Sequence, residues 1–537
     1  MKKLVSRFMA VLMAMTMILS MSMTAFAAEA SKGTLTVNNT VEGKTLDLYQ
    51  IFTATKNGEN VAYTLNSAYE GFFKNNTRIP ESESLTGEAL SEKAYEYVKT
   101  QVGEDGKNGT GFAKEILGWI LANADTVAAT HTTAPTTAGT TVINNLDYGY
   151  YVVYPLGATD TSAAPGEQDY TSVASLVSVT GDTSINMKSN YPTVVKKVND
   201  KTADDVNIGD TVTYTLTSKV PDMTGYTSYV FNFKDTLSAG LTFKEITSVT
   251  VGDTTITKVE AGQEANDTYT LTQAGQNITI TMNNFLASNA NKVGQEIKVT
   301  YTATLNKDAV TGFDPNTNKA TVEYSNKPGT DDKGESEPSK VDVHTFNFTI
   351  FKYYLKGETK TGLANAEFEL YKANTAGDAA DENAKINIVD EGNGVYRQAT
   401  ADEAKVTGFT SAKIVSDDDG KVLVKGLDAG SYYLRETKAP EGYNKLLSDI
   451  KVEIKATYGE DGKLVSYTVD YTYNGTTTPG IAITNKTDSP EVAVENKTGA
   501  QLPSTGSKGA LMVTLAGIVL FGALTASKAF GKKKANN

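Results

Sequence analysis

Apolar and polar residues alternate with a period of two along most of the chain. The clearest runs are residues 210–216, 296–303 and 346–352. Successive side chains of a strand point to opposite faces, so this alternation predicts antiparallel sheets with one face on a hydrophobic core. The runs are also rich in Thr, Val and Tyr, which suit a pleated, half-buried surface. We therefore predict an all-β protein built from tandem β-sandwich domains.

Two breaks in the alternation divide the chain. The first lies at 188–192, where a run ends and Pro192 enforces extended backbone before the next strand. The second is the polar, turn-rich stretch 326–334. The sequence thus predicts three domains, at residues 32–190, 193–326 and 340–497.

The first domain differs from the others because it contains helical patterns. Residues 91–102 and 111–124 place apolar side chains at near-helical spacing. We interpret them as a small helical insertion packed against the first sandwich.

The N-terminal residues have the pattern of a secretory signal peptide. Three basic residues open the chain: Lys2, Lys3 and Arg7. An apolar stretch, 8–23, follows them, and the small-x-small pattern at 25–27 supplies a cleavage site. Residues 1–27 are therefore predicted to be removed on export.

The C-terminal segment 502–537 combines three features in order. The pentapeptide Leu502-Pro503-Ser504-Thr505-Gly506 precedes an apolar run, 510–526, and a basic end at 532–534. At about 17 residues, the apolar run is at the short limit for a transmembrane stretch. The segment resembles the LPXTG sorting signal cut by sortase transpeptidases of Gram-positive bacteria. The resemblance implies that Thr505 is passed to an amine, after transient membrane retention, and that the protein ends covalently anchored to peptidoglycan on the cell surface.

Charge and composition exclude several classes of function. Trimming both ends removes eight basic residues and no acid, so the formal charge changes from −13 to −21. A strongly acidic protein does not bind nucleic acid through its overall field. The chain has no cysteine, and its only histidines are His131 and His344. We therefore predict no metal site, no cofactor and no enzyme of the Ser-His-Asp, Cys-His or zinc type.

A twelve-residue segment of the third domain is highly specific. Residues 432–443 read Y-Y-L-R-E-T-K-A-P-E-G-Y. This segment resembles the E-box of Gram-positive pilins and of Cna-B-type domains. The resemblance implies an immunoglobulin-like, Cna-type sandwich with Glu436 inside it. It also implies that this glutamate assists a self-catalysed amide bond between a lysine of the first strand and an asparagine of the last.

The lysine matching this pattern is Lys352, which shares strand parity with Phe346, Phe348 and Ile350 and is expected to point inward. The matching asparagine is Asn496, and Asn485 competes with it because it also follows an alternating run.

Burial explains why these residue types are required. A lysine is a nucleophile only as the neutral amine, which burial among apolar side chains favours. The same burial favours a neutral carboxyl, so Glu436 would donate a hydrogen bond to the asparagine carbonyl. Attack by the amine would then expel ammonia in a single turnover, with the glutamate shuttling protons.

The second domain offers an equivalent set, which resembles the middle domain of pilin backbone subunits. The resemblance assigns Lys196 as the amine, Asp235 as the proton shuttle and Asn318 as the acceptor. Lys197 stays open as an alternative to Lys196, because adjacent residues face opposite sides and periodicity does not say which side is the core. The opening strand of the first domain has no similarly placed lysine, so no bond is predicted there.

The three domains, the two predicted bonds and the sorting signal together resemble a major (backbone) pilin subunit. The resemblance implies a pilus, or fimbria, polymerised by sortase through Thr505 and a lysine of the next copy, with minor or tip pilins as further partners and a role in adhesion to an unknown receptor. In that family the acceptor lysine commonly follows a Tyr-Pro pair, whereas Thr193 follows Pro192 here. Lys197 is the first candidate acceptor, with Lys196 and Lys188 as alternatives. A monomeric cell-wall-anchored adhesin or minor pilin is the alternative function.

Overall fold

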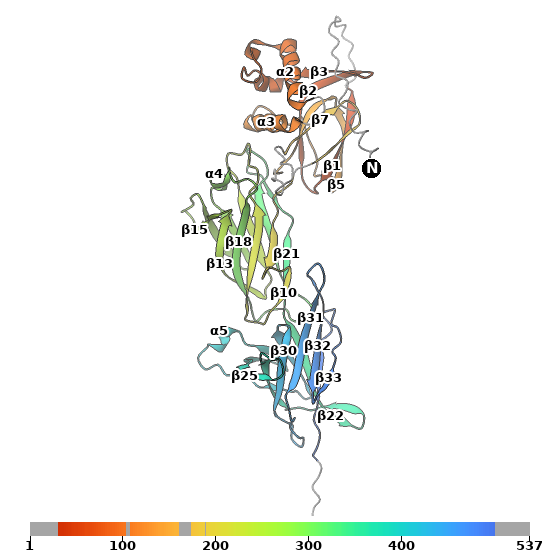
Figure 1. Ribbon diagram of the computed structural model, residues 1–537, viewed down its shortest axis with the longest axis vertical. Helices are drawn as coiled ribbons and strands as arrows, with labels where there is room; N and C mark the ends of the chain where they lie inside the picture. The colour runs from red at the N-terminus through yellow and green to blue at the C-terminus, as the bar shows by residue number, and fades with distance from the viewer. Residues whose placement is uncertain (1–30, 104–107, 160–172, 188–189, 500–537) are drawn as a thin grey trace, which may run out of the picture.

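The computed structural model describes residues 31–103, 108–159, 173–187 and 190–499. Three units lie end to end and give the molecule an elongated shape (Figure 1). Within the described ranges, no helix combines the length and apolar character needed to cross a bilayer. The predicted signal peptide, the 502–537 segment and Lys188 lie outside the described residues.

The first unit contains two sheets. Its strands are β1 (Lys32–Thr40), β2 (Leu46–Asn57), β3 (Asn60–Leu65), β4 (His131–Thr132), β5 (Gly139–Asp147), β6 (Gly149–Pro155), β7 (Ser175–Val179) and β8 (Thr183–Asn186). One sheet has the order β5-β1-β8, and the other has the order β3-β2-β6-β7 with β4 paired to β2. Leu35 and Leu48 belong to the core between the two sheets.

Helices cover the outer face of the second sheet in this unit (Figure 1). They are η2 (Ser67–Tyr69), α1 (Glu70–Phe73), η3 (Ser82–Ser84), α2 (Gly87–Val102) and α3 (Gly109–Ala122). Ile51 and Phe52 of β2 pack with Phe72 and Ile116 of the helices. Strand β2 is therefore buried on both faces, and the helical insertion predicted from the sequence is present as α2 and α3.

The second unit is a β-sandwich whose strands alternate between buried and exposed residues. Its elements are β9 (Val195–Val198), β10 (Ala203–Asp205), β11 (Thr211–Lys219), β12 (Phe231–Leu237), β13 (Leu241–Val251), β14 (Thr254–Thr255), β15 (Thr257–Lys258), β16 (Thr268–Ala274), β17 (Asn277–Met282), α4 (Phe285–Asn289), β18 (Glu296–Leu305), β19 (Asn316–Ser325), β20 (Lys333–Glu335) and β21 (Ser339–His344). A five-stranded sheet, β14-β13-β18-β11-β9, faces an eight-stranded sheet, β10-β21-β19-β12-β17-β16-β15, in which β20 pairs with β19.

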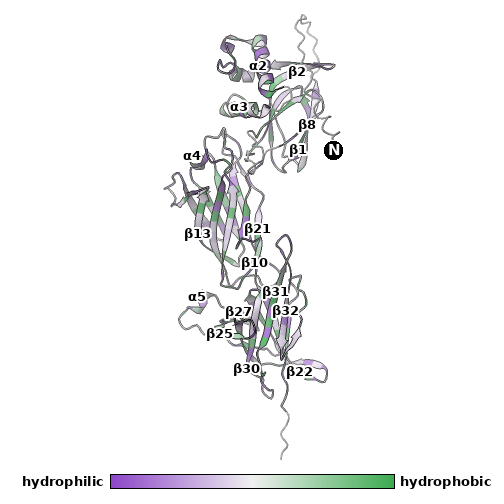
Figure 2. Cartoon of the chain, viewed as in Figure 1, coloured by the Kyte–Doolittle hydropathy of each residue, from purple (hydrophilic) through white to green (hydrophobic). Residues whose placement is uncertain are grey.

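The third unit repeats this architecture. Its elements are β22 (Phe346–Lys356), β23 (Thr359–Gly362), β24 (Glu367–Ala373), β25 (Ala380–Lys385), β26 (Ile388–Gly392), β27 (Val395–Gln398), α5 (Ala401–Ala404), β28 (Ile414–Val415), β29 (Lys421–Leu427), β30 (Gly430–Lys438), β31 (Ile450–Tyr458), β32 (Leu464–Tyr473), β33 (Thr476–Thr478) and β34 (Glu491–Glu495). One sheet has the order β23-β22-β29-β27-β26 with β34 paired to β22, and the other has the order β25-β24-β30-β31-β32-β33 with β28 paired to β24. The alternation of hydropathy along the strands is visible in Figure 2.

The second sandwich extends further along the chain than the predicted limit at residue 326. Strands β20 and β21 both pair with β19, and β21 contributes Val341 and Val343 to the core of the second unit. The stretch 326–334 is thus a turn within this sandwich, because polar turn residues connect strands of one sheet as readily as they connect domains. The third sandwich begins with β22, directly after Thr345.

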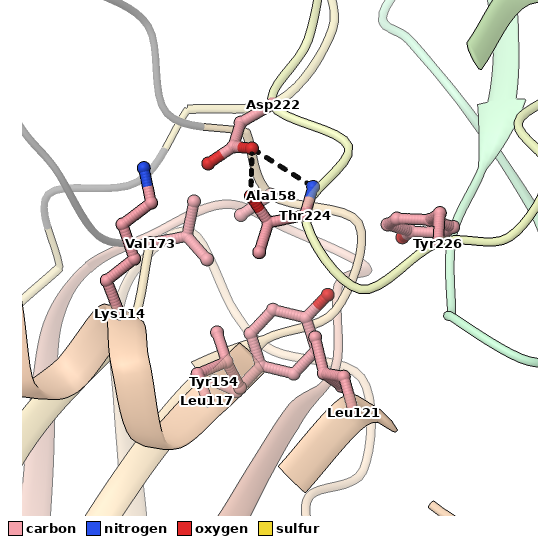
Figure 3. Close-up of a pocket in the computed structure, with 9 residues that line it drawn as sticks. All are labelled: Lys114, Leu117, Leu121, Tyr154, Ala158, Val173, Asp222, Thr224 and Tyr226. Atoms are coloured by element: carbon pink, nitrogen blue, oxygen red, sulfur yellow. Dashed lines mark hydrogen bonds between the residues drawn. The ribbon is translucent and has the colours of Figure 1, made fainter. Parts of the chain in front are cut away.

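Direct contacts join the units at both boundaries. At the first boundary a small, mostly apolar hollow lies between α3 and the segment 222–226, with Asp222 accepting hydrogen bonds from Thr224 N and Oγ1 (Figure 3). At the second, Tyr458 Oη and Ala429 N donate to the two carboxylate oxygens of Asp205 at 2.7 and 2.8 Å. Asp428 N also donates to Asn207 Oδ1, and Ile208 N donates to Gly426 O, so several hydrogen bonds connect the third unit to the second.

Candidate functional site

The second sandwich buries the amine of Lys196. Strand β9 alternates, with Val194, Lys196 and Val198 inward and Lys197 exposed. Lys196 is only 2% exposed, on a strand that pairs with β11. The sequence did not distinguish the two adjacent lysines, and the pairing of β9 at the edge of this sheet places Lys196 in the core.

Three polar side chains surround this amine. Lys196 Nζ donates to Asp235 Oδ2 on β12 and, at 2.7 Å, to the Tyr301 hydroxyl on β18. Tyr301 Oη in turn donates to Asp235 Oδ2 at 2.8 Å and accepts from Asn318 Nδ2 on β19 at 2.7 Å. The sequence-predicted lysine, aspartate and asparagine therefore lie together, and Tyr301 touches all three.

Tyr301 is a site residue that the sequence reasoning missed. Its position in the alternating run 296–303 predicts burial, since it shares parity with Ile297 and Val299. Alternation along one strand carries no information on which groups of the opposite sheet its hydroxyl meets. Strand parity therefore could have indicated a buried tyrosine, but not its three partners.

The acceptor atoms of this set are incompletely satisfied. Within the described part of the chain, Asn318 Oδ1 and Asp235 Oδ1 are buried and have no hydrogen-bond partner. A buried polar atom without a partner costs about 1–3 kcal/mol.

Burial favours the neutral form of the Lys196 amine. Lys196 Nζ lies 4.9 Å from the ring centroid of Tyr214 and 5.1 Å from that of Tyr301. Burial lowers the pKa of Lys196 from its ordinary value to about 8, although the Asp235 carboxylate opposes the shift. About a tenth of the amine is thus neutral, and hence nucleophilic, at pH 7, far more than for a hydrated lysine.

The third sandwich builds a similar site from different strands. Lys352 is fully buried on β22, in parity with Phe348 and Ile350. Its Nζ lies 3.0 Å from Oε1 of Glu436, which projects inward from β30 of the opposite sheet. Burial lowers the pKa of Lys352 to about 8, against the opposing effect of the Glu436 carboxylate.

Asn496 completes this site from the end of β34. Asn496 N donates to Tyr353 O at 2.9 Å, so the asparagine continues the parallel pairing of β34 with β22. Its Nδ2 lies 3.4 Å from Glu436 Oε2 and donates to Asn444 O at 2.5 Å. Asn485 instead lies in an exposed turn, where it bonds Asp488 and Thr487.

The E-box turn brings a loop over Glu436. Tyr443 N donates to Pro440 O at 3.1 Å, and Gly442 has a φ of 85°, a left-handed conformation that favours glycine. The chain then returns so that Leu446 N donates to Glu436 Oε2 at 2.7 Å. The residues after the glutamate in the motif therefore help to enclose it.

The two sites would join different pairs of strands. Lys352 and Asn496 belong to neighbouring strands of one sheet, whereas Lys196 and Asn318 belong to opposite sheets of the sandwich. Two further strands, β20 and β21, follow Asn318 in the second sandwich. A link from β9 to β19 would therefore leave these strands outside the covalent loop.

The candidate acceptor lysines differ in accessibility. Lys197 is exposed on β9, whereas the amine of Lys196 is enclosed. On β1 of the first unit, the inward positions hold Gly33, Leu35 and Val37. No three His, Asp or Glu side chains among the described residues are placed to hold a metal ion.

An unbonded Lys352 is expected to make stability rise with pH. Its pKa is about 8 in the folded chain and about 10.5 unfolded, so the unfolded chain binds more protons between these values. In Asn496→Ala, which removes the acceptor amide, titration of this amine is expected to add about 1.5 kcal/mol to the free energy of unfolding from pH 8 to 9.5. Denaturant unfolding at several pH values measures the change.

The matched control is the double variant Lys352→Met, Asn496→Ala, which lacks the titrating amine. Its stability should lack this increase, and equal pH dependence in the two variants would contradict the assignment. About a quarter of the tyrosines of the unfolded chain are ionised at pH 9.5, which lowers the stability of both variants, so the quantity compared is the difference between the two curves.

Two parts of the chain match known protein families. Residues 208–328 match the family described as Gram-positive pilin backbone subunit 2, Cna-B-like domain. Residues 352–468 match the SpaA family, described as a prealbumin-like fold domain. The matched segments lie in the second and third units, which hold the two buried sets.

Similar proteins include pilins of several Gram-positive bacteria. The trypsin-resistant surface T6 protein of Streptococcus pyogenes serotype M6 is 27% identical over 333 residues, which cover 54% of this chain and 51% of that protein. The chain thus spans about half the length of this curated relative. The structure of the T6 backbone pilin of serotype M6 Streptococcus pyogenes has a TM-score of 0.46 at 18% identity, covering 88% of this chain and 100% of that one. The Corynebacterium diphtheriae major pilin SpaA has a TM-score of 0.43 at 16% identity, covering 87% and 100%.

Proposed function

We propose that this protein is the structural backbone subunit of a covalently polymerised pilus on a Gram-positive cell. The observation that carries the proposal is that residues 208–328 match a pilin backbone domain, and that Asp235 and Asn318 of this segment meet Lys196 of the preceding strand β9 in the core. A sortase transpeptidase joins Thr505 of one copy to a lysine of the next, and the last copy is attached to peptidoglycan. Such a shaft supports adhesion, alone or with minor pilins at its tip.

The buried sets act as single-turnover sites that stiffen each subunit. The neutral lysine Nζ attacks the asparagine Cγ, and a new N–C bond forms as the Cγ–Nδ2 bond breaks. The neutral carboxyl of Asp235 or Glu436 donates to Oδ1 of the amide and returns protons to the departing nitrogen, which leaves as ammonia. The products are an isopeptide bond from Lys196 to Asn318 and a second bond from Lys352 to Asn496.

Such bonds take the place of disulfides in a chain without cysteine. Each closes a loop of more than about 100 residues, which by analogy with a disulfide contributes about 5 kcal/mol by constraining the unfolded chain. Lys352 and Asn496 lie near the two ends of the third unit. Tension applied to the termini would therefore pass through their bond, and the strands between β22 and β34 would not be pulled apart. A shaft subunit needs this property more than a solitary surface protein does.

Polymerisation is expected to depend on Thr505. In the producing bacterium, a Thr505→Ala variant should lose the ladder of high-mass species seen when cell-wall extracts are separated under denaturing conditions. The matched control is Ser504→Ala, which changes the variable position of the L-P-x-T-G signal and should retain the ladder.

The same experiment separates the alternative function. A monomeric cell-wall-anchored adhesin or minor pilin would give a single wall-linked species in the wild type, lost in Thr505→Ala. That pattern would overturn the shaft assignment and leave the sorting signal in place.

A further inference from the structure

Lys44 has an unusual position at the boundary between the first and second units. It lies in the loop 41–45 that connects β1 and β2, and its side chain is half-buried. The amine reaches across to the second unit, where Nζ donates to Tyr324 Oη at 2.9 Å and to Glu335 O at 3.3 Å. The side chain is therefore held in one place by groups on β19 and β20.

Aromatic faces complete the surroundings of this amine. Lys44 Nζ lies 4.8 Å from the ring centroid of Tyr191 and 5.5 Å from that of Tyr324. Tyr191 also lines a surface hollow with Thr40, Val41, Thr136 and Met187. The amine thus lies beside the Tyr191-Pro192 joint and next to a recess in the surface.

Removal of the Lys44 amine from solvent favours loss of its proton. Among the described residues, no carboxylate oxygen lies within 4.0 Å of Lys44 Nζ. Burial lowers the pKa of Lys44, and the nearby Glu337 carboxylate only partly opposes this effect. A larger share of this amine is neutral, and hence nucleophilic, than for a fully hydrated lysine.

Lys197 presents a different environment. It is exposed on β9, and no hydrogen bond or ion pair to another described residue fixes its amine. A fixed nucleophile has already lost the freedom that a mobile one must lose in the transition state. Positioning therefore favours Lys44 over Lys197 as a reacting amine.

We propose that Lys44 is the lysine that accepts the next subunit. This inference rests on the proposed polymerisation of the chain. The Lys44 amine attacks the Thr505 carbonyl carbon of another copy while that carbonyl is held by a sortase as an acyl-enzyme. A new amide N–C bond forms, the bond to the enzyme breaks, and the lysine proton passes to the leaving group. No oxidant or further reactant is needed, because Gly506 has already departed with its amine.

The experiment uses the full chain in the producing bacterium, with the variants Lys44→Arg and Lys197→Arg. Arginine keeps a positive charge and hydrogen-bond donors for Tyr324 and Glu335 but remains protonated and cannot be acylated under these conditions. Two readouts are taken: the high-mass ladder in cell-wall extracts, and the branched peptide found by mass spectrometry of digested wild-type polymer. The melting temperature of purified Lys44→Arg measures whether the fold is intact.

The expected result is loss of the ladder in Lys44→Arg, its retention in Lys197→Arg, and a branched peptide that joins Thr505 to Lys44. A ladder that persists in Lys44→Arg would overturn the inference, as would a wild-type branch at any other lysine. If the ladder depends on Lys197 instead, the pilus assignment stands while the Lys44 assignment fails. A wild type that forms only wall-linked monomers would overturn both.

Discussion

Replacing Glu436 with alanine is expected to prevent the bond in the third unit. Residues 28–505 of the variant should then lie about 17 Da, one ammonia, below the mass calculated from the variant's own sequence, whereas the wild type should lie about 34 Da below its calculated mass. Without the carboxyl, neither the carbonyl of Asn496 nor the leaving nitrogen has its proton donor. The third unit should lose about 5 kcal/mol of stability, because more than 100 residues are no longer enclosed in a covalent loop. At the size of this unit, its unfolding temperature should fall by about 15 °C.

Intact-mass spectrometry and calorimetry measure the two effects. The matched control is Glu441→Ala, which removes an exposed glutamate of the same motif and should leave the mass deficit and the unfolding temperature unchanged. If the Glu436 variant still lies about 34 Da below its own calculated mass, Glu436 is not required for the bond. If the folded wild type has its full calculated mass, neither bond exists.

Asp235→Ala is expected to have the corresponding effect in the second unit. The variant should lie about 17 Da below its own calculated mass, independently of the Glu436 variant, and the double variant should have its full calculated mass. The loss of stability should again be about 5 kcal/mol, and in addition Lys196 loses the carboxylate that now contacts it. Glu245→Ala, at an exposed position on β13, is the matched control.

Tyr301→Phe separates positioning from proton transfer in this site. The variant keeps the ring that contacts Lys196 and removes the hydroxyl that bonds Lys196, Asp235 and Asn318. Bond formation should be slower by about 10-fold or more, while the final mass stays that of the bonded chain. The fraction of unbonded chain at early times after induction of expression measures the rate. An unchanged time course would show that Tyr301 only fills space.

The two sites would respond differently to tension along the molecule. In the third unit the proposed bond joins β22 and β34, which are parallel neighbours at the start and end of the sandwich. In the second unit, β20 and β21 follow Asn318, and β21 leads directly into the third unit. Tension would therefore act on β21 before it reaches the covalent link, so this strand depends on its pairing with β19 and β10.

The sequence alone determined the fold class and the direction of Lys352. Phe346, Phe348 and Ile350 alternate with more polar residues, which identifies the face of this strand that packs on the core, and Lys352 lies on the same face. Glu436 was identified by a motif whose turn residues, Pro440 and Gly442, act locally. These features depend on neighbours in the chain, which is why a pattern of residues was sufficient to predict them.

The tertiary structure decided what depends on distant pairing. Valines lie on both sides of the Lys196-Lys197 pair, so the residue pattern does not show which lysine is buried. The pairing of β9 with β11 decides this, because it places Lys196 on the core face of the sheet and Lys197 on the exposed face. Asn485 and Asn496 both end alternating runs, but only the segment before Asn496 pairs with β22.

The same reason explains the residues that the sequence did not reveal. The partners of Tyr301 come from three other strands. In the sequence Lys44 has the pattern of an ordinary polar loop residue, and its contacts with the second unit appear only in the folded chain. Alternation and turn chemistry describe how a segment meets solvent or core. They carry no information about which distant side chains meet, because that is fixed by strand order, register and domain packing.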